Sequence, residues 1–90
     1  MPAPAEGRWA FEAEGGASGL LVLEQRFQEV SGDLDGRELR DVSLRGRQIR
    51  FTVDRPDGAR IFQGIVGDAE ILPDPAAPDA AANWRARRVG

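Results

Sequence analysis

The stretch Ile49-Arg50-Phe51-Thr52-Val53 alternates apolar and polar side chains. A period of two puts the apolar residues on one face of a β-strand and the polar residues on the other. Turn sequences bound the strand, Gly46-Arg47 before it and Arg55-Pro56-Asp57-Gly58 after it. In the second turn proline presets φ and glycine accepts a positive φ. A short strand between two tight turns predicts antiparallel hairpins on both sides.

The same alternation continues towards both termini, whereas the apolar spacing of an amphipathic helix does not occur. Further strands are predicted at 8–14, 21–27, 30–34, 39–44, 61–66, 70–72 and 83–89. Between two of them, Asp35-Gly36 is a strong signal for a type I′ hairpin turn. The alternation slips near Gln28-Glu29, where we favour a tight turn over a bulge, and an irregularity is expected near Asp41.

The strand at 61–66 has two possible inward faces. The candidates are Ile61, Gln63 and Ile65 on one face and Phe62, Gly64 and Val66 on the other. Each face carries two large apolar residues, so the alternation alone does not choose between them.

Seven or eight short strands joined by turns of two to four residues predict an all-β, antiparallel up-and-down meander. Parallel strands would need crossover connections of a dozen or more residues. Because an open meander leaves edges that invite aggregation, we expect a closed or nearly closed, lipocalin-like barrel. Trp9 lies on the first strand and Trp84 on the last, so the two aromatic residues are expected to meet where these strands pair and close the barrel.

The chain of 90 residues has room for one domain. We expect residues 1–7 to be a linker and residues 8–89 to form a single β-barrel-like domain. Within it, residues 73–82 hold three of the 6 prolines and several alanines. Proline removes a ladder donor, so this segment is predicted to be a surface loop, called here the Pro/Ala-rich loop.

The residue types narrow the possible chemistry. The sequence has no Cys, His, Tyr or Lys, and all 12 basic residues are arginine. Thiolate or imidazole metal sites, cysteine or lysine nucleophiles and histidine acid–base catalysis are therefore excluded. Paired carboxylates such as Asp33 and Asp35 could act in glycoside hydrolysis, but solvated turn positions explain them better. We expect this segment to contain no catalytic, cofactor-binding or metal-ligating residues.

Charge and hydropathy limit the partners. The net charge of −3 disfavours nucleic-acid binding, which requires a cationic face. No apolar run approaches the roughly 20 residues that span a bilayer, so no membrane partner is expected.

Three residues are candidates for facing a ligand: Gln25, Trp9 and Trp84. Gln25 shares an inward face with Leu21, Leu23 and Phe27, and a buried amide needs hydrogen-bond partners. It could bond backbone groups near a turn, or it could face a small polar ligand inside the barrel. The number of bulky inward residues favours a lumen filled by side chains.

A recurring pattern of apolar residues and glycines runs through most of the chain, about residues 7–88 outside the Pro/Ala-rich loop. They are Gly7-Arg8-Trp9-x-Phe11, Leu21-x-Leu23-x-Gln25-x-Phe27-x-x-Val30-x-Gly32, Leu44-x-Gly46-x-x-Ile49-x-Phe51, Phe62-x-Gly64-x-Val66-Gly67-Asp68 and Trp84-x-Ala86-x-Arg88. This pattern resembles the C-terminal β-domain that follows the catalytic core of bacterial class I S-adenosylmethionine-dependent methyltransferases. Nearly all matched positions are core apolar residues or turn glycines.

The resemblance implies a non-catalytic accessory domain that contributes stability, substrate presentation or partner contact. Its partner would be its own upstream methyltransferase core, and S-adenosylmethionine would be a cofactor of that parent enzyme, with none bound by this segment. The resemblance also favours Phe62, Gly64 and Val66 as the inward face of their strand. We expect the chain to be a monomer in isolation. The alternative is a small lipocalin-like barrel that binds a small apolar ligand.

Overall fold

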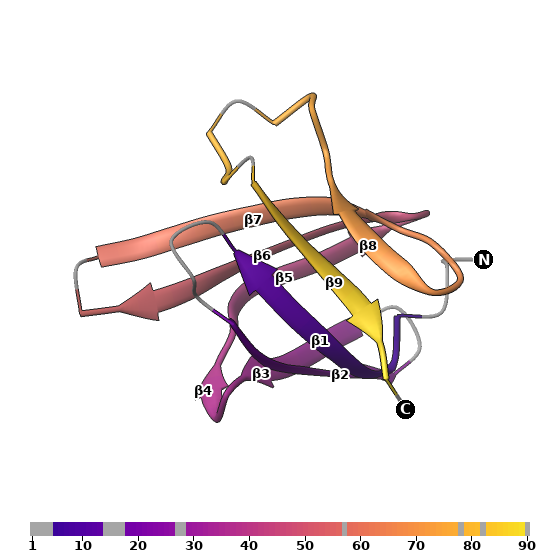
Figure 1. The fold of residues 1–90 in the computed structure, drawn as a ribbon, viewed down its shortest axis with the longest axis horizontal. Helices are drawn as coiled ribbons and strands as arrows, with labels where there is room; N and C mark the ends of the chain where they lie inside the picture. The colour runs from indigo at the N-terminus through magenta and orange to yellow at the C-terminus, as the bar shows by residue number, and fades with distance from the viewer. Residues whose placement is uncertain are drawn as a thin grey trace.

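The computed structural model describes residues 5–13, 18–26, 29–56, 58–77, 79–81 and 83–89. Over these residues the chain is all-β, with nine strands and no helix (Figure 1). The strands are β1 (Gly7–Ala13), β2 (Ser18–Arg26), β3 (Glu29–Leu34), β4 (Arg37–Glu38), β5 (Arg40–Arg45), β6 (Gln48–Arg55), β7 (Gly58–Val66), β8 (Glu70–Pro73) and β9 (Trp84–Arg88). The all-β prediction is confirmed. The strand count is one or two higher than predicted, because two-residue β4 forms directly after the turn that ends β3.

The strands form one antiparallel sheet in the order β4-β3-β2-β1-β9-β8-β7-β6-β5. β1 and β9 pair along their length, from Trp9 opposite Arg88 to Ala13 opposite Trp84. Figure 1 shows the two strands side by side, although they are far apart in the sequence. The pairing of β1 with β9 joins the first and last strands of the sheet. The two edge strands, β4 and β5, are not hydrogen-bonded to each other, and across this seam β3 and β4 lie beside β5 and β6. The structure is a nearly closed barrel, as predicted.

The turns and irregularities fall where the sequence places them. Asp35 and Gly36 have φ values of 53° and 84°, the two positive values that a type I′ turn requires. Arg26 lies opposite Glu29, so the chain reverses between them, as favoured over a bulge. Asp41 has a φ of 51°, and the pairing of β5 with β6 shifts register between Arg40 and Ser43.

The inward face of β7 is Phe62, Gly64 and Val66, which are all buried. Gly64 lies where a β-carbon would approach the backbone oxygen of Leu72 to 2.7 Å. The wall therefore passes too close to this position for a side chain. Trp84 and Ala86 on β9 face inward, as predicted. Phe27, also predicted to face inward, lies outside the described residues.

The core is one cluster of apolar side chains in the barrel interior. Its buried members are Ala5, Trp9, Phe11, Leu21, Leu23, Val30, Leu39, Ile49, Phe51, Val53, Phe62, Val66, Ile71, Trp84 and Ala86. Ala5 belongs to this core although it precedes β1, in the segment expected to be a linker.

The Pro/Ala-rich loop joins β8 to β9 and is anchored to the barrel wall. The Asp74 carboxylate accepts hydrogen bonds from Gln48 Nε2 and Gln63 Nε2, both at 3.0 Å. Farther along the loop, Arg50 Nη2 donates to Asp79 Oδ2 at 2.6 Å. The described part of this loop is therefore held against β6 and β7 by charged and polar side chains.

The barrel has two different ends. We call the end where β1 begins the closed end, since Ala5 is buried there beside Trp9. The opposite end is the mouth, where β2 begins at Ser18 and the turn at Asp35 follows β3. Alternate turns of an up-and-down meander lie at the same end, so the turn after Arg55 also borders the mouth.

Candidate functional site

Gln25 and Trp9 meet at the closed end, on the backbone of Ala5. The Gln25 side-chain oxygen accepts a hydrogen bond from the Ala5 amide at 3.1 Å. Trp9 Nε1 donates to the Ala5 carbonyl oxygen at 3.0 Å. The Arg88 guanidinium carbon lies 4.2 Å from the centroid of the Trp9 ring, a cation–π contact. Gln25 and Trp9 thus satisfy the amide and the carbonyl group of Ala5 and hold in place the chain segment that enters the barrel.

Trp84 lies in an aromatic cluster in the middle of the barrel. Its ring stacks on Phe11 at a centroid distance of 5.7 Å and meets the edges or faces of Phe51 and Phe62 at 6.0 and 5.5 Å. Edge-to-face and offset contacts at these distances are favourable aromatic packing. The Trp84 ring nitrogen is buried and has no hydrogen-bond partner among the described residues. Trp84 therefore fills the lumen. β1 and β9 pair with each other, but the two tryptophans do not lie opposite one another, because Trp9 lies opposite Arg88 and Trp84 lies opposite Ala13.

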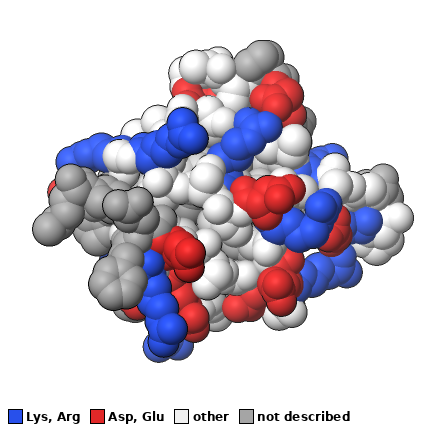
Figure 2. Space-filling model, turned by 180° about the vertical axis from the view of Figure 1, so that it is seen from behind, with Lys and Arg blue, Asp and Glu red and all other residues white. Residues whose placement is uncertain are grey.

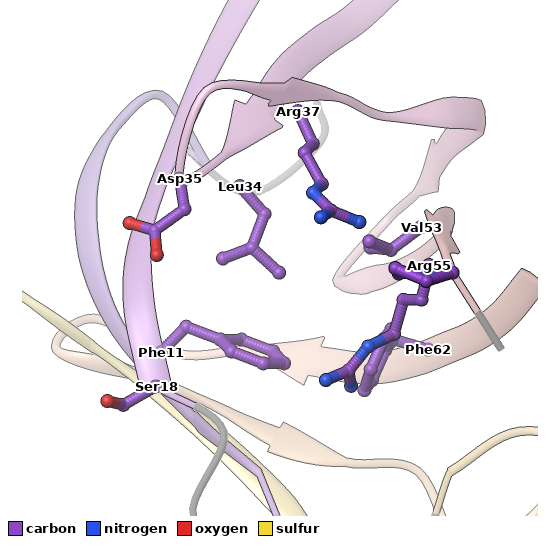
Figure 3. Close-up of a pocket in the computed structure, with 9 residues that line it drawn as sticks. Phe11, Ser18, Leu34, Asp35, Arg37, Val53, Arg55 and Phe62 are labelled. Atoms are coloured by element: carbon purple, nitrogen blue, oxygen red, sulfur yellow. The ribbon is translucent and has the colours of Figure 1, made fainter.

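Beyond this cluster, the barrel opens into a cavity at the mouth. Its volume is about 260 Å³. We call it the mouth pocket, and its lining residues are Phe11, Ser18, Leu34, Asp35, Arg37, Val53, Arg55, Pro56 and Phe62. Figure 3 shows the side chains of Arg37 and Arg55 reaching towards the cavity from two different strands, with the Arg55 guanidinium beside Phe62 and level with the Phe11 ring. The pocket combines a deep apolar base with a cationic rim.

The two arginines of the mouth pocket have no carboxylate partner among the described residues. Arg37 Nη1 donates to the backbone oxygen of Asp54 at 3.0 Å. Arg55 makes no hydrogen bond or ion pair within the described part of the chain. By contrast, Arg40 binds the Asp54 carboxylate through two nitrogens, at 2.6 and 2.7 Å. That hydrogen bond lowers the pKa of Asp54 from its usual value, so this carboxylate stays charged and engaged by Arg40.

The remaining acid at the rim is also engaged elsewhere. Asp35 Oδ1 accepts a hydrogen bond from the Leu20 amide at 3.1 Å. Figure 3 shows its carboxylate directed away from the two guanidinium groups. Among the described residues that line the cavity, the charged groups directed towards it are therefore the two guanidinium groups.

The sequence interpretation missed Arg37 and Arg55. Each flanks a hairpin turn, where an arginine usually indicates a solvated surface. The topology of the predicted meander could have indicated them, because alternate turns of a meander lie at the same end of the barrel. The arginines beside the Asp35-Gly36 and Pro56-Asp57-Gly58 turns could have been placed together on that basis.

Other kinds of site find little support. Among the described residues, no three acidic side chains converge as a metal site would require. In the same ranges, no helix has the length and hydrophobicity to cross a membrane. On the face shown in Figure 2, basic and acidic residues are interspersed over the described surface, so this face offers no broad cationic strip.

Comparison with protein-family models, with curated proteins and with solved structures finds no match to this chain.

Proposed function

We propose that this chain is a non-catalytic accessory domain, of the kind found after the catalytic core of bacterial S-adenosylmethionine-dependent methyltransferases. The observation that carries the proposal is the filled interior. Phe11, Phe51, Phe62 and Trp84 pack with ring centroids 5.2 to 6.0 Å apart across the lumen. A barrel filled in this way has no internal chamber for a nucleotide or a substrate.

The residue chemistry supports the same proposal. The sequence lacks Cys, His, Lys and Tyr, so thiol and amine nucleophiles and histidine acid–base catalysis are unavailable to it. The carboxylates Asp54 and Asp79 are bound to arginines at 2.6 Å, and Asp74 is bound to two glutamines. These acids hold strands and loops together, so the domain would act by stability, substrate presentation or contact with the upstream core. S-adenosylmethionine would bind in that core.

Two measurements test this proposal. Isothermal titration of the 90-residue chain with S-adenosylmethionine should give no binding heat, and a micromolar binding signal would contradict an accessory role. The coding sequence that precedes Met1 in frame should encode a strand, a glycine-rich turn and an acidic residue about 20 positions later. An in-frame stop codon directly upstream of Met1 would contradict the methyltransferase parentage.

The second candidate is a small lipocalin-like barrel that binds a small apolar ligand. The mouth pocket supports a binding role of some kind. However, the aromatic cluster fills the middle of the lumen, and a purely apolar molecule in the mouth pocket would have to desolvate Arg37 and Arg55. Fluorescence titration of the two tryptophans with apolar compounds tests this candidate, since Trp84 contacts the Phe11 and Phe62 rings at the base of the pocket.

A further inference from the structure

We propose that the mouth pocket is a binding site for a small organic anion, a carboxylate or phosphate ester that carries a short apolar group. Arg37 and Arg55 would bind the anionic group, and the apolar group would lie over Phe11 and Phe62. This inference goes beyond the accessory role and does not depend on it.

The first argument concerns charge. Arg37 on β4 and Arg55 at the end of β6 direct two guanidinium groups over one cavity (Figure 3). Like charges that share a cavity repel each other, and an anion between them removes that cost. Elsewhere in the described chain, Arg40 and Arg50 each have a carboxylate oxygen at 2.6 Å. Within the described ranges, neither arginine at the mouth has a carboxylate at ion-pair distance, so an anion from outside the chain would fill this role.

The second argument concerns the position of the donors. The backbone oxygen of Asp54 holds Arg37 through Nη1, and the other nitrogens of this guanidinium remain available. Asp54 is itself fixed through its bidentate contact with Arg40. Arginine presents its donors in a planar fork that matches carboxylate and phosphate oxygens. Arg37 is therefore partly oriented before any ligand arrives, which lowers the entropic cost of binding.

The third argument concerns size and apolar contact. Phe11, Val53 and Phe62 close the base of the pocket and are at most 3% exposed. Leu34 and Pro56 complete its apolar wall. The volume of about 260 Å³ lies below the ~300 Å³ at which drug-sized pockets begin. The pocket therefore suits a small molecule, with one short apolar group beneath the anionic one.

The test compares matched probes on the intact chain. Phenylpropionate supplies a ring and a carboxylate, phenylpropionamide is its uncharged counterpart, and phenyl phosphate replaces the carboxylate. Binding is followed by backbone amide NMR shifts and by titration calorimetry. We expect phenylpropionate to bind with a dissociation constant in roughly the millimolar range, with shifts at mouth residues. The amide should bind about tenfold or more weakly, because it cannot form charge-assisted hydrogen bonds.

Variants locate the site. Arg55→Gln should weaken phenylpropionate binding about tenfold, and Arg37→Gln should act in the same direction. Arg47→Gln is the matched control, because Arg47 is exposed in the turn before β6 and does not line the pocket. Thermal unfolding of each variant confirms that it folds, and the acid-to-amide comparison on the unmodified chain needs no variant.

Some outcomes would overturn the proposal. They are equal affinity for the acid and the amide, no amide shifts at the mouth at saturating probe, or equal losses in Arg55→Gln and Arg47→Gln. A stronger response to phenyl phosphate than to phenylpropionate would support the site and identify phosphate as its anion. None of these results depends on binding of S-adenosylmethionine, so this inference and the accessory role can fail separately.

Discussion

Replacing Gly64 with alanine tests the packing of the barrel wall around Trp84. Gly64 faces the interior from β7, and a β-carbon there would lie 2.7 Å from the Leu72 backbone oxygen. The same atom would lie 2.8 Å from Trp84 Cη2 and 2.9 Å from Ile71 Cγ2. Comfortable contact between carbon atoms begins at about 3.5 Å, so all three neighbours would have to move. The Leu72 oxygen belongs to the pairing of β7 with β8, which limits its retreat.

The expected loss of stability is the difference between two effects. Alanine in a compatible backbone conformation gains about 0.4–1 kcal/mol, because it restricts the unfolded chain. Overpacking a filled core costs about 1–3 kcal/mol. The net effect of Gly64→Ala is therefore a destabilisation of about 1–2 kcal/mol, which lowers the melting temperature of a domain of this size by roughly 5–15 °C.

Thermal unfolding followed by circular dichroism measures this effect, and near-ultraviolet spectra report on Trp84. The matched variant is Gly36→Ala in the β3–β4 turn, where φ is +84° and nothing lies within 4 Å of the added carbon. Gly36→Ala should lower stability through backbone strain while leaving the tryptophan spectrum unchanged. A Gly64→Ala protein as stable as the original, with the same spectrum, would show that the packing argument is wrong.

Three further measurements address hydrogen bonds and charge. Gln25→Met leaves the Ala5 amide without its acceptor, so we expect the free energy of unfolding to fall by about 1 kcal/mol and hydrogen exchange at Ala5 to become faster. Unchanged exchange at Ala5 would count against this hydrogen bond. Arg50→Met removes the bond to Asp79, and because the pair is exposed, the unfolding midpoint should barely change while amide exchange in the Pro/Ala-rich loop rises. Hydrogen bonds from arginines lower the pKa of Asp54 and of Asp79 from the usual 3.8. Both carboxylates therefore stabilise the fold above pH 3.8, and this contribution disappears as the pH falls through their lower folded-state pKa values. Because both pairs are exposed, urea unfolding should give a constant midpoint above about pH 5 and only a small decline below about pH 4, and a midpoint that rises on acidification would contradict the assignment.

Local patterns in the sequence predicted most of the fold, because strand alternation and turn chemistry act over a few residues. Asp35-Gly36 specifies its turn through two positive φ values, and the irregularity at Asp41 was visible as a break in period. The inward face of β7 was not visible locally, since both faces carry large apolar residues. Cross-strand pairing decides it, because Phe62 lies opposite Phe51 and both rings enter the same cluster.

The candidate site was much less predictable. Gln25 and Trp9 were singled out because they are polar or large among inward residues, yet both contact Ala5, a residue that no pattern placed in the core. Arg37 and Arg55 differ from the other arginines in lining one cavity from two strands, which depends on the three-dimensional neighbourhood. Single-residue chemistry indicates what an arginine can bind, and only the closed barrel shows which arginines remain available.

The two ends of the described chain leave the barrel together, away from the mouth. Arg88 Nη1 donates to the Glu6 carbonyl oxygen at 2.8 Å, and the Val89 amide donates to the Arg8 carbonyl oxygen at 2.9 Å. Immobilising the protein on a sensor surface through either terminus would therefore orient the arginine-lined rim towards the solution.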